Sequence, residues 1–172
     1  MGIIPTYNIS IDPGTNNTGI CVWSGGRVVQ GLPCLKKNPF TVYAKKEESF
    51  LGKLLAIKRA LVSLCDSLRS EPGNFGTIKS IAIEEFEGFH TAVDKRAFNK
   101  KAMIMCGQIA GMLLSVSDDW AEETIHISKR FVRKNESARL ADFLGVKGSE
   151  HALDAFYIGV CAGFDKRNMQ NG

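Results

Sequence analysis

Residues 7–20 read Tyr-Asn-Ile-Ser-Ile-Asp-Pro-Gly-Thr-Asn-Asn-Thr-Gly-Ile, and this stretch decides the fold. Apolar residues alternate up to Ile11, with the period of a half-buried β-strand. The strand runs into Asp12, and the Pro-Gly and Asn-Asn pairs that follow predict a tight turn. Ile20 and Val22 predict a second strand running back. A carboxylate at the end of a buried strand costs solvation energy unless a metal, a phosphate or a neighbouring donor compensates it.

The composition is that of an ordinary globular protein. The chain has 172 residues, of which 44% are hydrophobic and 23% charged. We expect a single domain over residues 1–172, with 166–172 as a frayed tail. The net charge of +4 permits nucleic acid as a partner without requiring it. No apolar run approaches the roughly 20 residues of a membrane span, so we expect a soluble intracellular protein with no membrane partner.

The five cysteines are scattered and include no C-x-x-C pair. This pattern predicts neither a zinc site nor a disulfide framework. We expect reduced thiols that serve mostly as small core residues.

The periodicity outward from the opening stretch predicts a mixed sheet flanked by helices. Hairpin-length connections indicate an antiparallel meander first, and helices separate the later strands. The predicted order is βββαβαβα, an α/β fold of three antiparallel strands followed by parallel strands. We expect strands over 7–12, 18–23, 27–32, 78–86 and 124–127, a loop over 32–43, long helices over 47–70 and 94–117, a short helix over 136–144, and a last helix over 150–164 that Ser149 caps.

Two glycines interrupt the second long helix. Gly107 and Gly111 lie four residues apart, so both fall on one helical face. Glycine within a helix costs roughly 0.5–1 kcal/mol relative to alanine. Their spacing suggests the close approach of another backbone, and packing on the sheet and a dimer contact are both open.

Three acids and one histidine form the candidate site. Asp12 ends the first strand, Glu84 follows the apolar run 81–83, and Asp154 lies among apolar residues of the last helix. His151 precedes Asp154 by three residues, so both project from one helical face. Converging carboxylates repel one another, and a divalent cation reverses that balance. Hard oxygen ligands favour Mg²⁺ or Mn²⁺, and a histidine shifts the preference towards Mn²⁺.

Each of these residues also has a simpler interpretation. Asp12 can cap its own turn, and Glu84 can be a surface acid beside Glu85 and Glu87. Asp154 can respond to the dipole of its helix, although that effect fades after one turn. The joint arrangement is a stronger argument for a metal site than any single member.

The chain resembles the RuvC-type Holliday junction resolvases of the RNase H-like superfamily, as a divergent member of the kind that phages encode. Four blocks carry the likeness, in the family's order and spacing: residues 9–19, 81–86, 106–111 and 151–159. The resemblance implies the RNase H-like mixed sheet. It also implies that Asp12, Glu84, His151 and Asp154 are catalytic residues and metal ligands. His151 stands where members of the family hold Asp or His.

The resemblance further implies a homodimeric endonuclease. It would bind four-way DNA junctions by their shape and cut two strands symmetrically, with Mg²⁺ or Mn²⁺, in DNA recombination and repair. Two ions per site can clamp the attacking and leaving oxygens of a phosphoryl displacement. Lys129 or Lys147 is a candidate for neutralising charge at the scissile phosphate. The implied location is the cytoplasm of a bacterium or of a phage-infected cell.

The DNA contacts that we expect lie around the Glu84 strand and before the short helix. Phe86 and Phe89 are candidates for stacking on unpaired bases, against the alternative that they belong to the core. A basic surface would contact phosphates and make binding salt dependent. Its candidate residues are Lys95, Arg96, Lys100, Lys101, Lys129, Arg130, Arg133 and Lys134.

Three other functions remain open. One is another RNase H-like nuclease that cuts branched DNA, flaps or RNA–DNA hybrids with the same site. A second is an actin-like ATPase or sugar kinase, because residues 12–19 also resemble their phosphate-binding turn; the absence of a second such turn in 172 residues argues against it. A third is a junction-binding protein without catalysis, against which the acids in the blocks 9–19, 81–86 and 151–159 argue.

Overall fold

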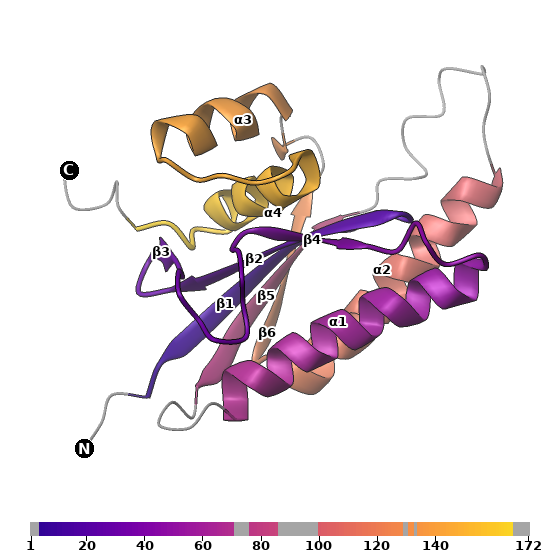
Figure 1. Ribbon diagram of the computed structural model, residues 1–172, viewed down its shortest axis with the longest axis horizontal. Helices are drawn as coiled ribbons and strands as arrows, with labels where there is room; N and C mark the ends of the chain where they lie inside the picture. Colours follow the sequence, from indigo (N-terminus) through magenta and orange to yellow (C-terminus); the bar gives the residue numbers. More distant parts are fainter. Residues whose placement is uncertain (1–3, 71–75, 86–99, 129–130, 133, 167–172) are drawn as a thin grey trace.

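The structure is a computed structural model that describes residues 4–70, 76–85, 100–128, 131–132 and 134–166. A six-stranded mixed sheet lies between two pairs of helices (Figure 1). The strands are β1 (Thr6–Asp12), β2 (Asn17–Ser24), β3 (Arg27–Val28), β4 (Phe40–Tyr43), β5 (Thr77–Glu85) and β6 (Glu123–Ser128). The helices are α1 (Phe50–Ser70), α2 (Lys100–Trp120), α3 (Lys134–Phe143) and α4 (Glu150–Cys161).

The sheet has the order β3-β2-β1-β5-β6, with β4 also paired to β2. Strands β1, β2, β3 and β4 pair in antiparallel fashion, whereas β1, β5 and β6 run parallel. The predicted α/β fold of antiparallel strands followed by parallel strands is therefore confirmed.

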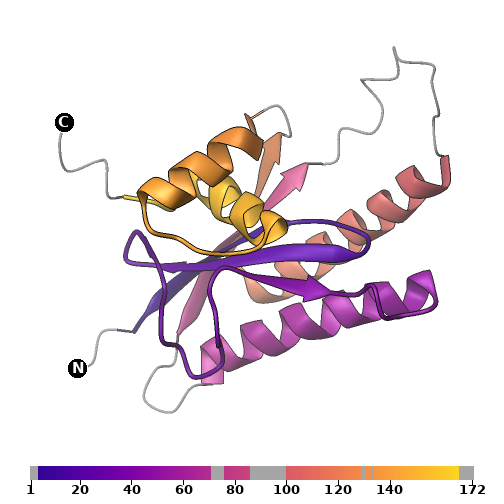
Figure 2. The ribbon, with the colours of Figure 1, turned by 45° about the horizontal axis from the view of Figure 1, so that its top comes forward.

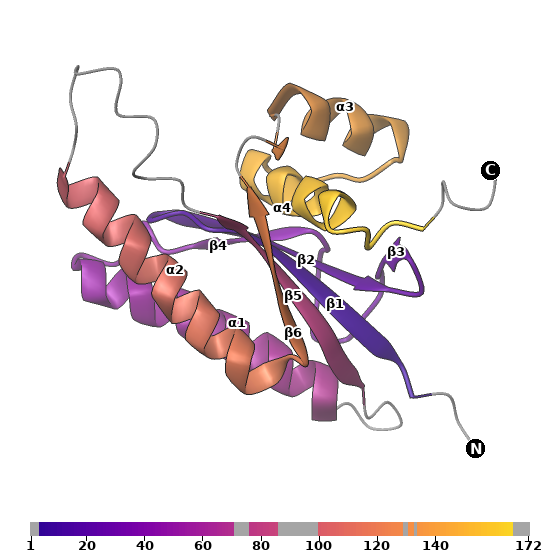
Figure 3. The ribbon, with the colours of Figure 1, turned by 180° about the vertical axis from the view of Figure 1, so that it is seen from behind.

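Helices lie on both faces of the sheet. Helices α1 and α2 cover one face, α4 lies on the other, and α3 packs on the outer side of α4 (Figures 1 and 3). The alternation in β1 separates the two sides, because successive side chains of a strand point to opposite faces. Ile9 and Ile11 belong to the core under α1 and α2, whereas Ser10 and Asp12 contact α4. The alternating pattern therefore directs Asp12 to the α4 side.

A few hydrogen bonds and aromatic contacts hold α4 against the sheet. Ser10 Oγ donates a hydrogen bond to the carbonyl oxygen of Ala155 at 2.6 Å and accepts one from Trp23 Nε1 at 2.9 Å. The Trp23 ring stacks on Phe156 with centroids 5.4 Å apart. A Cβ on Gly159 would lie 2.4 Å from Trp23 Nε1, so only glycine fits there. These contacts fix α4 across β1 and β2, and Figure 2 shows the helix lying over the sheet.

Several element boundaries differ from the prediction. The third strand covers only Arg27–Val28, and Phe40–Tyr43, predicted as loop, forms β4. Both strands pair with β2, β3 at its end and β4 at its start, so one edge of β2 serves two short partners. The last helix ends at Cys161 rather than at residue 164. Ser149 is its N-cap, but its side chain makes no capping hydrogen bond.

The glycine face of α2 does not pack on the sheet. Gly107 and Gly111 are exposed, and no described atom outside the helix lies within 4 Å of a Cβ built on either residue. The interpretation of these glycines as sheet-packing positions is therefore wrong. The dimer interpretation stays a prediction.

The five cysteines are free, as predicted, but only Cys21 and Cys65 are buried. The expectation that most of them are core residues is wrong for Cys34 and Cys161, which are exposed. Burial raises the pKa of Cys65 to about 12, so this thiol stays protonated at neutral pH. Among the described helices, none is long and apolar enough to cross a membrane.

Candidate active site

The site forms where β1 ends beneath the start of α4. Asp12 is 7% exposed, and its Oδ2 lies 2.7 Å from Nδ1 of His151 in the first turn of α4. With its proton on Nδ1, His151 donates a hydrogen bond to the carboxylate. The two residues are 139 positions apart in the chain. The fold therefore provides the neighbouring donor that the buried strand-end carboxylate requires.

Two glycines let the chain approach this pair closely. A Cβ on Gly19 would lie 1.8 Å from the carbonyl oxygen of His151 and 3.1 Å from the nitrogen of Ala152. Gly19 is the register partner of Asp12 in β2, so the start of α4 crosses directly over this pair of strands. A Cβ on Gly14 would lie 2.2 Å from the carbonyl oxygen of Asn17. Glycine is thus required both in the turn and under the helix.

Glu84 ends the neighbouring strand on the same face. The parallel register pairs Ser10 with Ala82 and Ile11 with Ile83, so Asp12 and Glu84 come next along β1 and β5. Register partners in neighbouring strands point to one side of the sheet, and Ala82 belongs to the core under α4. Glu84 is half-buried at this edge. The carboxyl ends of β1 and β5 therefore direct two acids towards the α4 layer.

Asp154 lies one turn beyond His151 on α4 and is held by α3. Its Oδ1 accepts a hydrogen bond from Ser137 Oγ at 2.8 Å, and Asp154 is 5% exposed. A second bond joins the same two helices, from Tyr157 Oη to Glu136 Oε2 at 2.7 Å. Helix α3 therefore fixes the side chain of Asp154. The sequence offered no signal for Ser137, which is one polar residue on a polar helix.

The turn after Asp12 leaves one acceptor without a donor. The side-chain oxygen of Asn17 is buried and has no hydrogen-bond partner among the described residues. Leaving such an acceptor unpaired costs roughly 1–3 kcal/mol. The opposite side of the turn is braced by Lys53, whose Nζ donates to Asn16 Oδ1 at 2.7 Å. The turn is thus fixed from α1 through Asn16.

The donor types suit a hard divalent cation. Asp12 Oδ2 and His151 Nδ1, 2.7 Å apart, are joined by a hydrogen bond, and Nδ1 could coordinate a cation only without the proton that it donates. Within the described part of the chain, however, no three His, Cys, Asp or Glu side chains gather as a metal cluster. The structure thus brings Asp12 and His151 together, whereas Asp154 bonds to Ser137 instead.

The predicted DNA contacts fall on parts of the chain that the structure does not describe. Lys100 and Lys101 begin α2, and Lys134 begins α3, with side chains outside the described set. The other predicted contacts lie wholly outside the described residues: Phe86, Phe89, Lys95, Arg96, Lys129, Arg130 and Arg133. All of them stay predictions. Lys147 is described and exposed, on the connection between α3 and α4.

The mixed sheet, its helical layers and the acids at its strand ends define an α/β protein of RNase H-like architecture. The fold is similar to that of two solved RuvC structures. A Thermus thermophilus RuvC in complex with a Holliday junction substrate matches with a TM-score of 0.64 at 16% identity, over 95% of this chain and 96% of that one. A second Thermus thermophilus RuvC structure matches with a TM-score of 0.60 at 16% identity, over 96% and 97%. No family model and no curated protein sequence matches the chain.

Proposed function

We propose that the protein is a metal-dependent endonuclease that resolves four-way DNA junctions. The observation that carries the proposal is the Asp12–His151 pair. It joins the start of α4 to the end of β1, beside Glu84 at the end of β5. The shared fold with a RuvC that was solved with a Holliday junction substrate supports the substrate class. The likeness concerns the fold, so the activity rests on the residues of this chain.

Asp12, Glu84, His151 and Asp154 would hold Mg²⁺ or Mn²⁺, and we propose two ions. When bound, the metal would lower the pKa of a water molecule and stabilise the leaving oxygen of a phosphodiester. The chain itself supplies orientation. Ser137 holds the Asp154 carboxylate at 2.8 Å, and the close contact of Gly19 with the His151 backbone sets the height of α4 over the strands.

The proposed activity is tested with a labelled mobile four-way junction. We expect symmetric nicking in Mg²⁺ or Mn²⁺ and none in EDTA. A flap, an RNA–DNA hybrid and a linear duplex serve as matched substrates, because a nuclease of different specificity would prefer one of the first two. Intact junctions together with hydrolysis of ATP would instead support the phosphate-binding interpretation of residues 12–19.

We also propose a homodimer, with α2 in the interface. Gly107 and Gly111 leave its exposed face flat, and Ile104 on the same helix is 54% exposed. Three- and four-residue spacing places these positions along one stripe. Small residues let a second helix approach closely, and an exposed isoleucine beside them adds apolar area.

Gly111→Arg is expected to convert the dimer into a monomer without unfolding it. The Cβ at this position meets no described atom within 4 Å, and the position is exposed, so the arginine can extend into solvent. Light scattering should give twice the 18.9 kDa chain mass for the wild type and the single mass for the variant. Ala138→Arg places the same side chain on an exposed position of α3 and should leave the dimer intact. A monomeric wild type contradicts paired incision by a dimer.

A further inference from the structure

A basic pocket opens beside the candidate site, between the β3–β4 connection and the α3–α4 connection. Its volume is about 910 Å³. The described lining carries Lys36, Lys37 and Lys147, all exposed, and no carboxylate. Gln30 and Tyr43 add further polar groups to its wall. Among the described residues that the sequence predicts near DNA, only Lys147 lines this pocket.

The wall that carries Lys36 and Lys37 is held to the sheet by Asn38. This side chain is 5% exposed, and its Oδ1 accepts from the backbone N–H of Val22 at 2.9 Å. Its Nδ2 donates to the carbonyl oxygens of Val22 and Val29, each at 2.7 Å. The oxygen and the nitrogen of the buried Asn38 amide are therefore both hydrogen-bonded to backbone groups of the protein. The two lysines project from a loop that is fixed before any ligand arrives.

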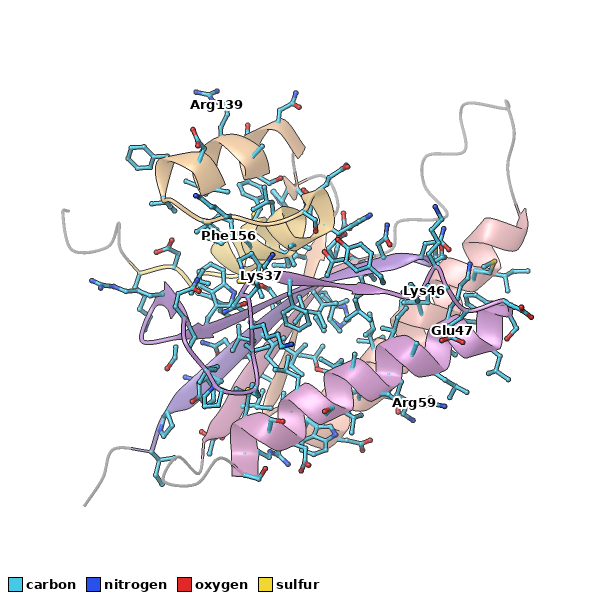
Figure 4. All side chains as sticks on the ribbon, in the orientation of Figure 1. Lys37, Lys46, Glu47, Arg59, Arg139 and Phe156 are labelled. Atoms are coloured by element: carbon cyan, nitrogen blue, oxygen red, sulfur yellow. The ribbon has the colours of Figure 1, made fainter. Side chains whose placement is uncertain are left out.

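The two walls meet next to the catalytic strands. Thr41 Oγ1 in β4 is hydrogen-bonded to Ser149 Oγ, two residues before His151. Thr41 is the register partner of Gly19, and Gly19 is the partner of Asp12. Two strand spacings, about 10 Å, therefore separate the Asp12 backbone from the edge of the pocket. Figure 4 labels Lys37 on the connection between β3 and β4 and Arg59 on α1.

We propose that this pocket binds the phosphodiester backbone of the nucleic-acid strand on one side of the bond to be cut. Lysines are mobile point charges that bind phosphate without demanding one base or one geometry. Contacts to phosphate fix the register of a strand and read no sequence. The distance from Asp12 suits phosphates adjacent to the reacting one. This inference rests on the proposed function for the identity of the strand.

The test is the salt dependence of binding for the triple variant Lys36→Ala/Lys37→Ala/Lys147→Ala. Affinity for a fluorescent four-way junction is measured in EDTA, so that cleavage plays no part. The slope of log K against log salt is negative, and each lost phosphate contact should reduce its magnitude by about 0.9. For the triple variant, we expect the magnitude of this slope to fall by about 2 to 3. We also expect the affinity for the junction to fall roughly tenfold or more at 100 mM salt. Replacement of the three lysines by arginine should preserve the slope.

The matched control removes three exposed positive charges elsewhere. Lys58→Ala/Arg59→Ala/Lys79→Ala lowers the net charge equally but changes α1 and β5. If the slope falls in magnitude by the same amount in both triple variants, binding reflects overall charge and the pocket proposal is overturned. A wild type that binds no DNA at low salt overturns it as well. A wild type that binds through the pocket but cuts nothing in Mg²⁺ or Mn²⁺ supports the pocket and contradicts the proposed nuclease.

Discussion

Asp12→Asn is expected to bind a four-way junction with wild-type affinity and to cut it at least roughly a thousandfold more slowly. The loss corresponds to about 4 kcal/mol of transition-state stabilisation. Asparagine has nearly the same shape, and its amide oxygen can still accept the hydrogen bond from His151. The substitution removes the negative charge that would hold a cation, in a position that is only 7% exposed. The fold should therefore survive while the chemistry stops.

The measurement separates binding from cleavage. Binding is followed by gel shift or anisotropy in EDTA, and cleavage by single-turnover nicking in Mg²⁺ and in Mn²⁺. Asp66→Asn removes the same charge from an exposed position of α1 and should cut at the wild-type rate. If Asp12→Asn keeps more than a tenth of the rate, Asp12 is not a metal ligand and the proposed site is wrong.

β1 and the acids at the carboxyl ends of β1 and β5 could be predicted from the sequence, because the patterns that indicate them lie within a few neighbouring residues. Alternation in β1 shows that Asp12 and Ser10 share a face, and Glu84 follows an apolar run. The pairing of Asp12 with His151 depends on the crossing of α4 over β2, which no local pattern contains. The resemblance could name the four residues, but it could not show that Asp154 bonds to Ser137.

β4 was missed for a related reason. Four residues after Pro39 are too short for a periodic signal, and the strand exists because the start of β2 has a free edge. That strand in turn forms one side of the basic pocket through Thr41. β4 and the pocket beside it thus depend on contacts between residues that are distant in the chain, and local sequence patterns do not predict such contacts.

Gly19→Ala is expected to destabilise the protein and to disable the site through the backbone. The new Cβ would lie 1.8 Å from the carbonyl oxygen and 2.4 Å from the carbonyl carbon of His151. Backbone atoms cannot rotate away as a side chain can, so the start of α4 must lift from β2. Overpacking of this kind costs about 3 kcal/mol. For a domain of this size, that lowers the melting temperature by roughly 6–12 °C.

Gly52→Ala is the matched control, because the three atoms nearest its Cβ belong to the side chains of Glu47 and Ser49, at 3.0 Å or more, and none is a backbone atom. That variant should melt within a few degrees of the wild type. The decisive comparison is nicking well below the melting temperature of Gly19→Ala, where the variant is folded. A folded variant with α4 displaced moves His151 away from Asp12, so its single-turnover rate should fall while junction binding in EDTA persists. If the folded variant cuts at the wild-type rate, the 2.7 Å contact between Asp12 and His151 is not needed for catalysis.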